Sequence, residues 1–323
     1  MKCRYALFKA LPLLLAMLPA AGHSETYPLK PVRMIVPFPP GGGADVTSRI
    51  FAPKLTEALG QQFFIDNRAG AAGTIGTGIV ARAAPDGYTL LVALSSVASS
   101  VSLYKNLSFD LSRDFSPIAV LATAPFVLAV HPSLPTKRVK ELIALAKARP
   151  GQLNYASTGK GGAPHLTMEM FRIQAGIDIV HVPYKGAPAA IPDLIGGQVS
   201  MMFASTLALL PQVKAGRLRA LGITSAKRSS LAPELPTIAE SGLPGFESTS
   251  WFALLAPAGT PREVVTGLNA TIAKIALTPE IIDRLAAQGG EPLVVAPKDV
   301  AAFVQSEIAK WGKVVAAAGI RTE

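Results

Sequence analysis

Residues 32–49 constrain the fold of this chain more than any other part of its sequence. An apolar, β-prone run from Val32 ends among prolines, turns through three consecutive glycines ending at Gly43, and enters a helical pattern at Ala44. A helix that starts directly after a glycine turn leaves backbone N–H groups unpaired at its positive end, and glycine lets a ligand approach the backbone closely. This pattern predicts either a site for a small anion such as a carboxylate or an ordinary strand-to-helix connection.

Strand and helix patterns alternate over the first part of the chain. Strands are expected at 32–37, 62–66 and 90–94, and helices at 44–59 and 74–83. Pro53 lies inside the first helical pattern and should kink or shorten that helix. The alternation predicts a parallel sheet with helices on both faces.

A second α/β unit is expected between residues 125 and 225. Its strands are predicted at 126–130, 153–156, 179–182, 199–203 and 218–224, and its helices at 137–148, 164–174, 188–195 and 207–215. Apolar residues from Val139 onward recur with helical spacing, and Thr136 is placed to cap the N-terminus of the first of these helices.

The third part of the chain repeats a motif of the second. The run Trp251-Phe-Ala-Leu-Leu-Ala-Pro-Ala-Gly-Thr-Pro261 resembles Pro125-Phe-Val-Leu-Ala-Val-His-Pro-Ser-Leu-Pro135, since each is an apolar strand that ends in a proline-bearing turn and opens a helix. Helices are expected at 261–277 and 298–318 and a short strand at 293–295, so this part should pack onto the first unit. We therefore predict an α/β fold of two domains, 25–124 plus 226–323 and 125–225, joined by two crossings around a hinged ligand cleft.

The N-terminus has the parts of a secretory signal peptide in their usual order. Basic residues precede an apolar stretch at 11–21, and small residues before Glu25 suit cleavage, so we expect residues 1–24 to be removed. The apolar stretch is shorter than the roughly 20 residues of a membrane-spanning helix, and a retained N-terminal anchor is the alternative. Because Cys3 is the only cysteine and lies in this segment, the mature chain should hold no disulfide and suits the periplasm.

The charge of the chain argues against nucleic acid as a partner. The formal net charge of +10 becomes +7 when the three basic residues within 1–24 are removed. The remaining charges are scattered, with no block of Lys and Arg and no interleaved aromatic residues. A modest positive field either helps to capture an anionic ligand or simply keeps the protein soluble.

The second unit contains a counterpart of the opening glycine turn. The run Asn154-Tyr-Ala-Ser-Thr-Gly-Lys-Gly-Gly-Ala-Pro-His-Leu166 is again a strand, a polar glycine turn and a helix start. Ser157 brings a hydroxyl group to this turn, and the Gly162 amide can face outward. Turns on opposite sides of a cleft could hold one anion between them. His165 could bind the ligand, orient the turn or cap it.

Motifs of common enzymes are missing from the sequence. Gly159-Lys160 lacks the spacing of a phosphate-binding loop, and Gly76-Thr-Gly-Ile-Val-Ala81 lies inside a helical pattern instead of at a strand-to-helix turn. There is no catalytic serine elbow and no cluster with metal-ligand spacing. We therefore expect no catalytic residues, no metal ion and no cofactor. A secreted hydrolase or isomerase, suggested by His165 near Ser157, is the alternative from another class of protein.

A series of short motifs runs in order along nearly the whole mature chain. They are Tyr27-Pro-Leu-Lys-Pro-Val-Arg33, Pro37-Phe-Pro-Pro-Gly-Gly-Gly-Ala-Asp45, Asn67-Arg-Ala-Gly70, Pro85-Asp-Gly-Tyr88, Leu103-Tyr-Lys-Asn-Leu-Ser-Phe-Asp110, His181-Val-Pro-Tyr-Lys-Gly186, Asp193-Leu-Ile-Gly-Gly-Gln198, Lys214-Ala-Gly-Arg-Leu-Arg-Ala-Leu221, Thr224-Ser-Ala-Lys-Arg228 and Leu254-Leu-Ala-Pro-Ala-Gly-Thr-Pro261. In these motifs the chain resembles the Bug receptors, the periplasmic substrate-binding proteins of tripartite tricarboxylate transporters.

This resemblance implies a two-lobed periplasmic-binding-protein fold, type II-like, which captures a small carboxylate and offers it to a membrane permease. We expect a monomer, and a sensor that presents its closed form to a signalling protein is the alternative. In such proteins the glycine turns of the two lobes grip a carboxylate, partly through ordered water. The implied ligand-binding residues are Phe38, Gly42, Gly43, Ala44 and Asp45 in the first turn and Ser157, Thr158, Gly162, Ala163 and His165 in the second.

The resemblance places the far end of the pocket, which sets specificity, at Ser95, Ser96 and Ser205. Ser95 and Ser96 follow the third predicted strand, where open α/β sheets bind ligands, or they form a simple turn. Many family members carry an aspartate after the Met-Phe pair of the strand before Ser205, suited to an ammonium group, but this chain has Ala204 there. Because a buried unpaired charge is costly, we predict a carboxylate ligand without an ammonium group, aliphatic or aromatic.

Overall fold

The computed structural model describes residues 27–320, and the expected signal peptide lies outside them. The strands are β1 (Val32–Val36), β2 (Phe63–Asn67), β3 (Thr89–Leu94), β4 (Phe115–Val130), β5 (Asn154–Ser157), β6 (Val180–Pro183), β7 (Met201–Ser205), β8 (Arg219–Ile223) and β9 (Thr249–Pro257). The α-helices are α1 (Gly43–Leu59), α2 (Thr74–Ala81), α3 (Ser95–Leu103), α4 (Val139–Ala148), α5 (Ala163–Ala175), α6 (Ala187–Ile195), α7 (Thr206–Lys214), α8 (Arg262–Ala276), α9 (Pro279–Ala286) and α10 (Pro297–Ala318). Among these helices, none has the length and hydrophobicity that crossing a membrane demands.

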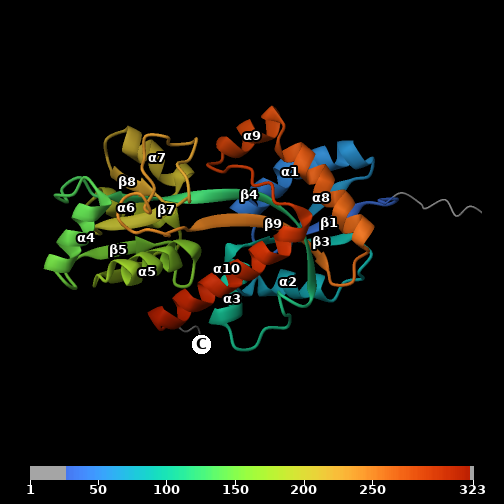
Figure 1. Ribbon diagram of the computed structural model, residues 1–323, viewed down its shortest axis with the longest axis horizontal. Coiled ribbons are helices and arrows are strands. Elements are labelled where there is room, and N and C mark those ends of the chain that lie inside the picture. The colour runs from blue at the N-terminus through green and yellow to red at the C-terminus, as the bar shows by residue number, and fades with distance from the viewer. Residues whose placement is uncertain (1–26, 321–323) are drawn as a thin grey trace, which may run out of the picture.

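The strands join in one curled sheet that forms the centre of two lobes (Figure 1). Their order is β2-β1-β3-β9-β4-β7-β5-β6, and β8 also pairs with β4. In the first lobe β1 pairs in parallel with β2 and β3, and in the second β5 pairs in parallel with β6 and β7. Between these groups β9 and β4 run antiparallel to their neighbours, so the fold is mixed α/β with two lobes, as the sequence predicts.

Strand β4 passes from one lobe into the other without a break. Its 16 residues pair with β9 from Phe115 to Pro125 and with β7 from Phe126 to Val130. The strand predicted at 126–130 is therefore only the second half of a longer one. The domain limits proposed at 124/125 and 225/226 stay a prediction.

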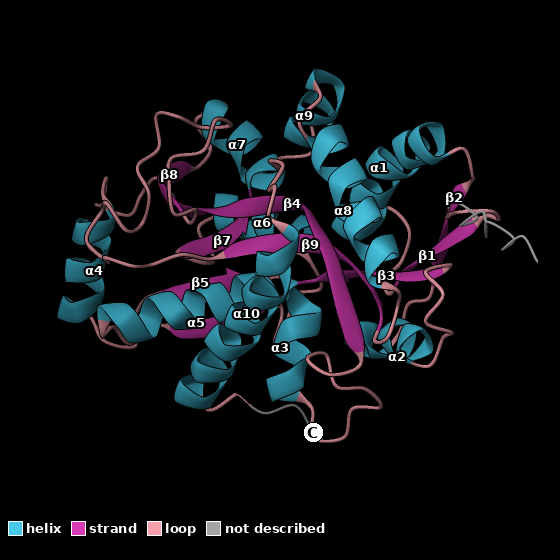
Figure 2. Ribbon diagram, turned by 45° about the vertical axis from the view of Figure 1, so that its right-hand side comes forward, coloured by secondary structure: helices cyan, strands magenta, loops and turns pink. Residues whose placement is uncertain are grey.

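The buried apolar side chains form one continuous group on one face of the sheet and two separate groups on the other. The continuous group includes Trp311 of α10 in the first lobe and Phe171 of α5 in the second. On the opposite face, α1 and α8 cover one group and α6 and α7 cover the other. Figures 1 and 2 show α10 lying across the first face, between α3 and α5. One face is thus packed across both lobes, whereas the other is packed lobe by lobe.

Two local predictions were wrong. Thr136 does not cap α4, which has Arg138 as its N-cap residue, and the Thr136 hydroxyl is buried without a hydrogen-bond partner in the described chain. The strand expected at 293–295 does not form. Only Glu291 bridges to Thr123 of β4, and the Val295 carbonyl accepts from the Asn269 side chain, 3.5 Å away, instead of from a strand.

Helix α1 continues through Pro53 to Leu59, so the expected shortening does not occur. Proline removes the hydrogen bond to the carbonyl four residues earlier, here that of Arg49. Arg49 and Pro53 are both exposed, so water can bond to the freed Arg49 carbonyl. The structure also adds two helices that we did not predict, α3 directly after β3 and α9 after α8.

A buried carboxylate connects α10 to strand β9. Glu307 of α10 is 7% exposed, and its Oε2 accepts hydrogen bonds from the indole N–H groups of Trp251 at 2.8 Å and Trp311 at 3.2 Å. Lys310 pairs with the other carboxylate oxygen. Because α10 packs against α3, α5 and β4, this contact anchors the helix that lies across both lobes.

Replacing Glu307 with alanine should destabilise the protein by about 3 kcal/mol, because two buried indole N–H groups lose their acceptor. Urea unfolding followed by circular dichroism measures this change. Glu57→Ala, at a side chain that is 73% exposed, is the control and should leave the midpoint nearly unchanged. Equal midpoints for the two variants would show that the indole contacts contribute nothing to stability.

Candidate functional site

A cavity of about 520 Å³ lies where the two lobes meet. The turn between β1 and α1, the ends of β3 and β7, the middle of β4, the start of β9 and the turn after α9 build its wall. The cavity thus lies between the two separate apolar groups of the sheet face that carries α1 and α7. Among the described residues that line it, none is Asp, Glu, Lys, Arg or His, so its wall carries no side-chain charge.

The N-terminus of α1 forms one side of this wall. Gly41 has a φ of +81°, Gly42 is the extended N-cap residue, and the helix begins at Gly43 with no side chain capping it. A Cβ on Gly43 would lie 2.8 Å from Cζ of Phe252, so glycine lets the first residue of the helix approach that ring. The unpaired N–H groups and the positive end of a 17-residue helix therefore belong to a wall without charged side chains.

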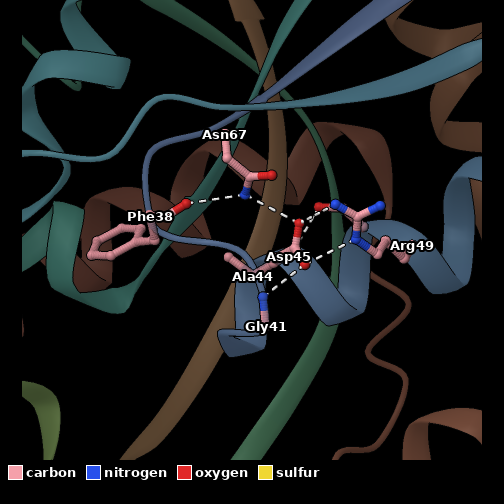
Figure 3. A network of polar contacts seen from close by, with 7 residues as sticks. Phe38, Gly41, Ala44, Asp45, Arg49 and Asn67 are labelled. Atoms are coloured by element: carbon pink, nitrogen blue, oxygen red, sulfur yellow. Dashed lines mark hydrogen bonds and ion pairs between the residues drawn. The ribbon is translucent and has the colours of Figure 1, made fainter.

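Asp45 stabilises this turn through hydrogen bonds made outside the cavity (Figure 3). Its carboxylate accepts hydrogen bonds from the Gly41 amide at 2.9 Å, from Arg49 at 2.9 and 3.0 Å, and from Asn67 at 3.1 Å. The Asn67 amide also donates to the Phe38 carbonyl at 3.0 Å. Burial raises the pKa of the Asp45 carboxyl, but hydrogen bonds from Arg49, Gly41 and Asn67 outweigh this effect and hold the pKa below its ordinary value. Asp45 therefore organises the turn as an anion and does not itself line the cavity.

A second helix N-terminus reaches the cavity from the other lobe. Ser205 is the N-cap residue of α7, no side chain caps that helix, and both Ser205 and Leu207 line the cavity. The Thr206 hydroxyl donates to the carbonyl of Gly289 in the first lobe at 2.8 Å. Helix ends from both lobes thus meet at one cavity, but the second one belongs to α7, whereas the sequence predicted the turn before α5.

The glycine turn before α5 is held by two stacked histidines and does not line the cavity. Nδ1 of His165 accepts from the Gly161 amide at 3.0 Å, and the His165 and His181 rings stack with their centroids 4.0 Å apart. Burial, with a smaller contribution from His181, lowers the pKa of His165 to about 4, so the ring is a neutral acceptor at pH 7. Of the roles open to His165, the structure shows that of orienting its turn.

Ser157 is fully buried and bonds to a different histidine from the one expected. Its hydroxyl lies 2.7 Å from Nε2 of His181 and accepts from the Gly159 amide at 3.2 Å. The pair His165 and Ser157, which suggested a hydrolase, is therefore not hydrogen-bonded: each residue has its own partner in the turn.

The structure brings five of the implied site residues together in the cavity wall: Phe38, Gly42, Gly43, Ala44 and Ser205. The others are not among its lining residues, namely Asp45, Ser95, Ser96, Ser157, Thr158, Gly162, Ala163 and His165. Ser95 lies next to the wall, since its Oγ is 3.5 Å from that of Ser250, which does line the cavity. Ser95 and Ser96 are the first residues of α3. They therefore form neither of the two structures expected from the sequence, a simple turn or a ligand-binding loop after the strand.

Several lining residues were missed in the sequence. They are Pro39, Pro40, Gly41, Val46, Thr47, Leu94, Ala122, Ala124, Phe126, Leu207, Ser250, Phe252, Leu285, Gln288 and Gly290. The alternation of a strand could have placed Ser250 and Phe252 on one face of β9, opposite Trp251. The apolar pair Ile281 and Leu285, four residues apart after Pro279, could likewise have indicated α9.

Comparison with known proteins identifies the family and the fold of the chain. Residues 47–320 match the family model described as tripartite tricarboxylate transporter family receptor. Protein BugT of Bordetella pertussis is 39% identical over 300 residues, which cover 92% of each chain. The solved structure of R. palustris Rpa4515 with adipate is 39% identical and covers 92% of this chain and 100% of that one, with a TM-score of 0.77. MatC from Rhodopseudomonas palustris with bound malate is 32% identical, covers 90% and 100%, and has a TM-score of 0.73.

These matches extend over nearly the whole of the described chain, and they include both sequence similarity and structural similarity. The family model spans both lobes, and the two solved structures share the arrangement of strands and helices at more than 30% identity. The chain therefore belongs to the tripartite tricarboxylate transporter receptor family and is one of its Bug receptors.

Proposed function

We propose that this chain is a periplasmic receptor that binds a small carboxylate without an ammonium group between its lobes and delivers it to the permease of a tripartite tricarboxylate-type transporter. The observation that carries the proposal is a cavity that combines two uncapped helix N-termini with a wall free of charged side chains. Membership of a family of transporter receptors supports the delivery step and the periplasmic location.

The carboxylate would bind where the backbone supplies positive potential. An anion that leaves water needs hydrogen-bond donors, and no Lys, Arg or His side chain in the described wall offers them. The amides at the start of α1, from Gly43 onward, are unpaired donors at the positive end of the helix dipole. Their position at the cavity wall supports the β1–α1 turn as the carboxylate site.

The rest of the ligand would meet neutral and mainly apolar groups. Phe126, Leu207 and Phe252 line the cavity, and its polar side chains are the neutral Thr47, Ser205, Ser250 and Gln288. An ammonium group would find no carboxylate partner there and would stay unpaired at high cost. The related proteins that hold adipate and malate bind acids without an ammonium group, which supports the same class of ligand here.

Small carboxylates should raise the melting temperature of the purified protein, because a ligand that binds only the folded state stabilises it. At 100 times Kd the gain is about 2.7 kcal/mol, or roughly 5 °C for a chain of this size. Succinate, malate, adipate and benzoate form the test panel in a thermal-shift assay. Aspartate is the matched control for succinate, since the two differ only by an ammonium group. A larger shift with aspartate would refute the ammonium argument, and no shift with any acid would refute carboxylate binding.

Ser205→Asp should weaken binding of the best carboxylate by at least about tenfold, because two negative charges would share a cavity of low polarity. Isothermal titration calorimetry gives the Kd. Ser306→Asp, at an exposed residue of α10, adds the same charge far from the wall and should leave the Kd unchanged. If Ser205→Asp bound as tightly as Ser306→Asp, the ligand would not reach the end of β7.

Asp45→Asn should lower stability at pH 7 by about 1 to 3 kcal/mol and should weaken carboxylate binding, because the turn loses its charged acceptor. The folded-state pKa of Asp45 lies below its unfolded value near 4, so the carboxylate stabilises the fold above about pH 4 and this contribution is lost as pH falls through the folded pKa. The difference in urea midpoint between variant and wild type should therefore be full at pH 7 and smaller at pH 3. A difference that is constant with pH would contradict this role.

A further inference from the structure

The turn that follows α9, residues 287–291, belongs to the first lobe and contacts the start of α7 in the second. Figures 1 and 2 show α9 and α7 on the same face of the sheet. The Gly289 carbonyl accepts from the Thr206 hydroxyl at the start of α7, at 2.8 Å. We call residues 287–291 the α9 turn.

Glu291 ties the end of the α9 turn to the chain that leaves the second lobe. Its Oε1 accepts from the Ser229 hydroxyl at 2.5 Å, and from the Ser230 amide and hydroxyl at 2.9 and 3.0 Å. Its backbone exchanges two hydrogen bonds with Thr123 of β4, at 2.8 and 2.9 Å. The α9 turn is thus bonded to strand β4, to the start of α7 in the second lobe and to the segment that leaves that lobe.

Gly289 lies tightly against the start of α7, where a side chain would have no room. Its φ of +70° lies in the region that favours glycine. A Cβ at this position would collide with the Thr206 hydroxyl oxygen and lie 2.8 Å from the backbone nitrogen of Leu207. Because a backbone atom cannot move aside as a flexible side chain can, any larger residue must separate the α9 turn from α7.

The same turn closes one side of the cavity. Gln288 and Gly290, on either side of Gly289, line it together with Leu285 at the end of α9. The contact between Gly289 and Thr206 therefore sits at the rim of the candidate ligand site. Opening the lobes on this face would move α7 away from the α9 turn and break this contact. The apolar groups on this face are separate, so they do not hold the lobes together.

We infer that the α9 turn is an interlobe fastener that holds the cavity closed, and that Gly289 is the positioning residue that allows it. This inference rests on the proposed receptor function. It assigns Gly289 no contact with the ligand: the residue acts by setting how closely α7 approaches the first lobe. A larger residue there shifts the equilibrium toward open forms, and the apparent Kd rises in inverse proportion to the closed fraction that remains.

Gly289→Ala tests the inference, with Gly216→Ala as the matched control. Gly216 follows the end of α7 with a φ of +69°, and a Cβ added to it would have no neighbour within 4 Å, so alanine there has the same backbone strain without the collision. Small-angle X-ray scattering of the ligand-free proteins should give a larger radius of gyration for Gly289→Ala than for Gly216→Ala. The Kd for the best carboxylate of the panel should rise about tenfold or more in Gly289→Ala only, because a smaller fraction of the variant is closed.

Thr206→Val and Glu291→Gln provide a second route that adds no bulk. Thr206→Val removes the hydroxyl donor to Gly289. Glu291→Gln removes the negative charge of the acceptor of Ser229 and Ser230. Both keep the shape of the side chain, and each should shift the radius of gyration in the same direction by less.

Gly289→Ala and Gly216→Ala with the same radius of gyration and the same Kd would overturn the inference. If Gly289→Ala fails to fold, wild-type values of both quantities in Thr206→Val and Glu291→Gln would overturn it instead. Because scattering needs no ligand, an expanded Gly289→Ala in a protein that binds no acid would refute the receptor function and leave the fastener standing.

Discussion

The continuous strand β4, paired along its first part with β9, is the constraint on which the rest of the structure depends. Because β4 belongs to the sheets of both lobes, their relative position is set by backbone hydrogen bonds and not only by side-chain packing. Side chains of a strand alternate between the two faces of its sheet, so β9 sends Trp251 to one face and Phe252 to the other. The first reaches Glu307 of α10, and the second packs against the start of α1 at the cavity.

The two faces of the sheet consequently have different mechanical roles. On the α10 face the apolar group is continuous, so separation of the lobes there would expose buried surface and cost free energy in proportion to its area. On the α1 and α7 face the apolar groups are separate, and the cavity and a few polar contacts lie between them. Opening at the second face, with the first as the hinge side, is the motion that loses the least packing.

The sequence predicted the parts of the fold that depend on local pattern. The glycine turn before α1, the strand–helix alternation and the two long C-terminal helices follow from periodicity and turn residues, and the structure has them within a few residues. The cap was misplaced because α4 begins two residues after the predicted start, and the strand at 293–295 was wrong because a tertiary partner, Asn269, takes the Val295 carbonyl. The site was predicted in part. The cavity takes Gly43 and Ser205 from the prediction, but Gln288 and Gly290 join it through long-range packing, which no local pattern reveals.

The absence of charged side chains from the described wall has a further consequence for how the site distinguishes ligands. An arginine would bind carboxylates through its own flexible side chain, whereas helix N–H groups are fixed by the backbone and cost no ordering when a ligand arrives. In the proposed site Asp45 then has to remain outside the cavity, where Arg49 and Asn67 bond to its oxygens, because an exposed carboxylate beside those N–H groups would compete with an anionic ligand. The same residue that looks like a ligand contact in the sequence therefore serves the site best by staying out of the cavity.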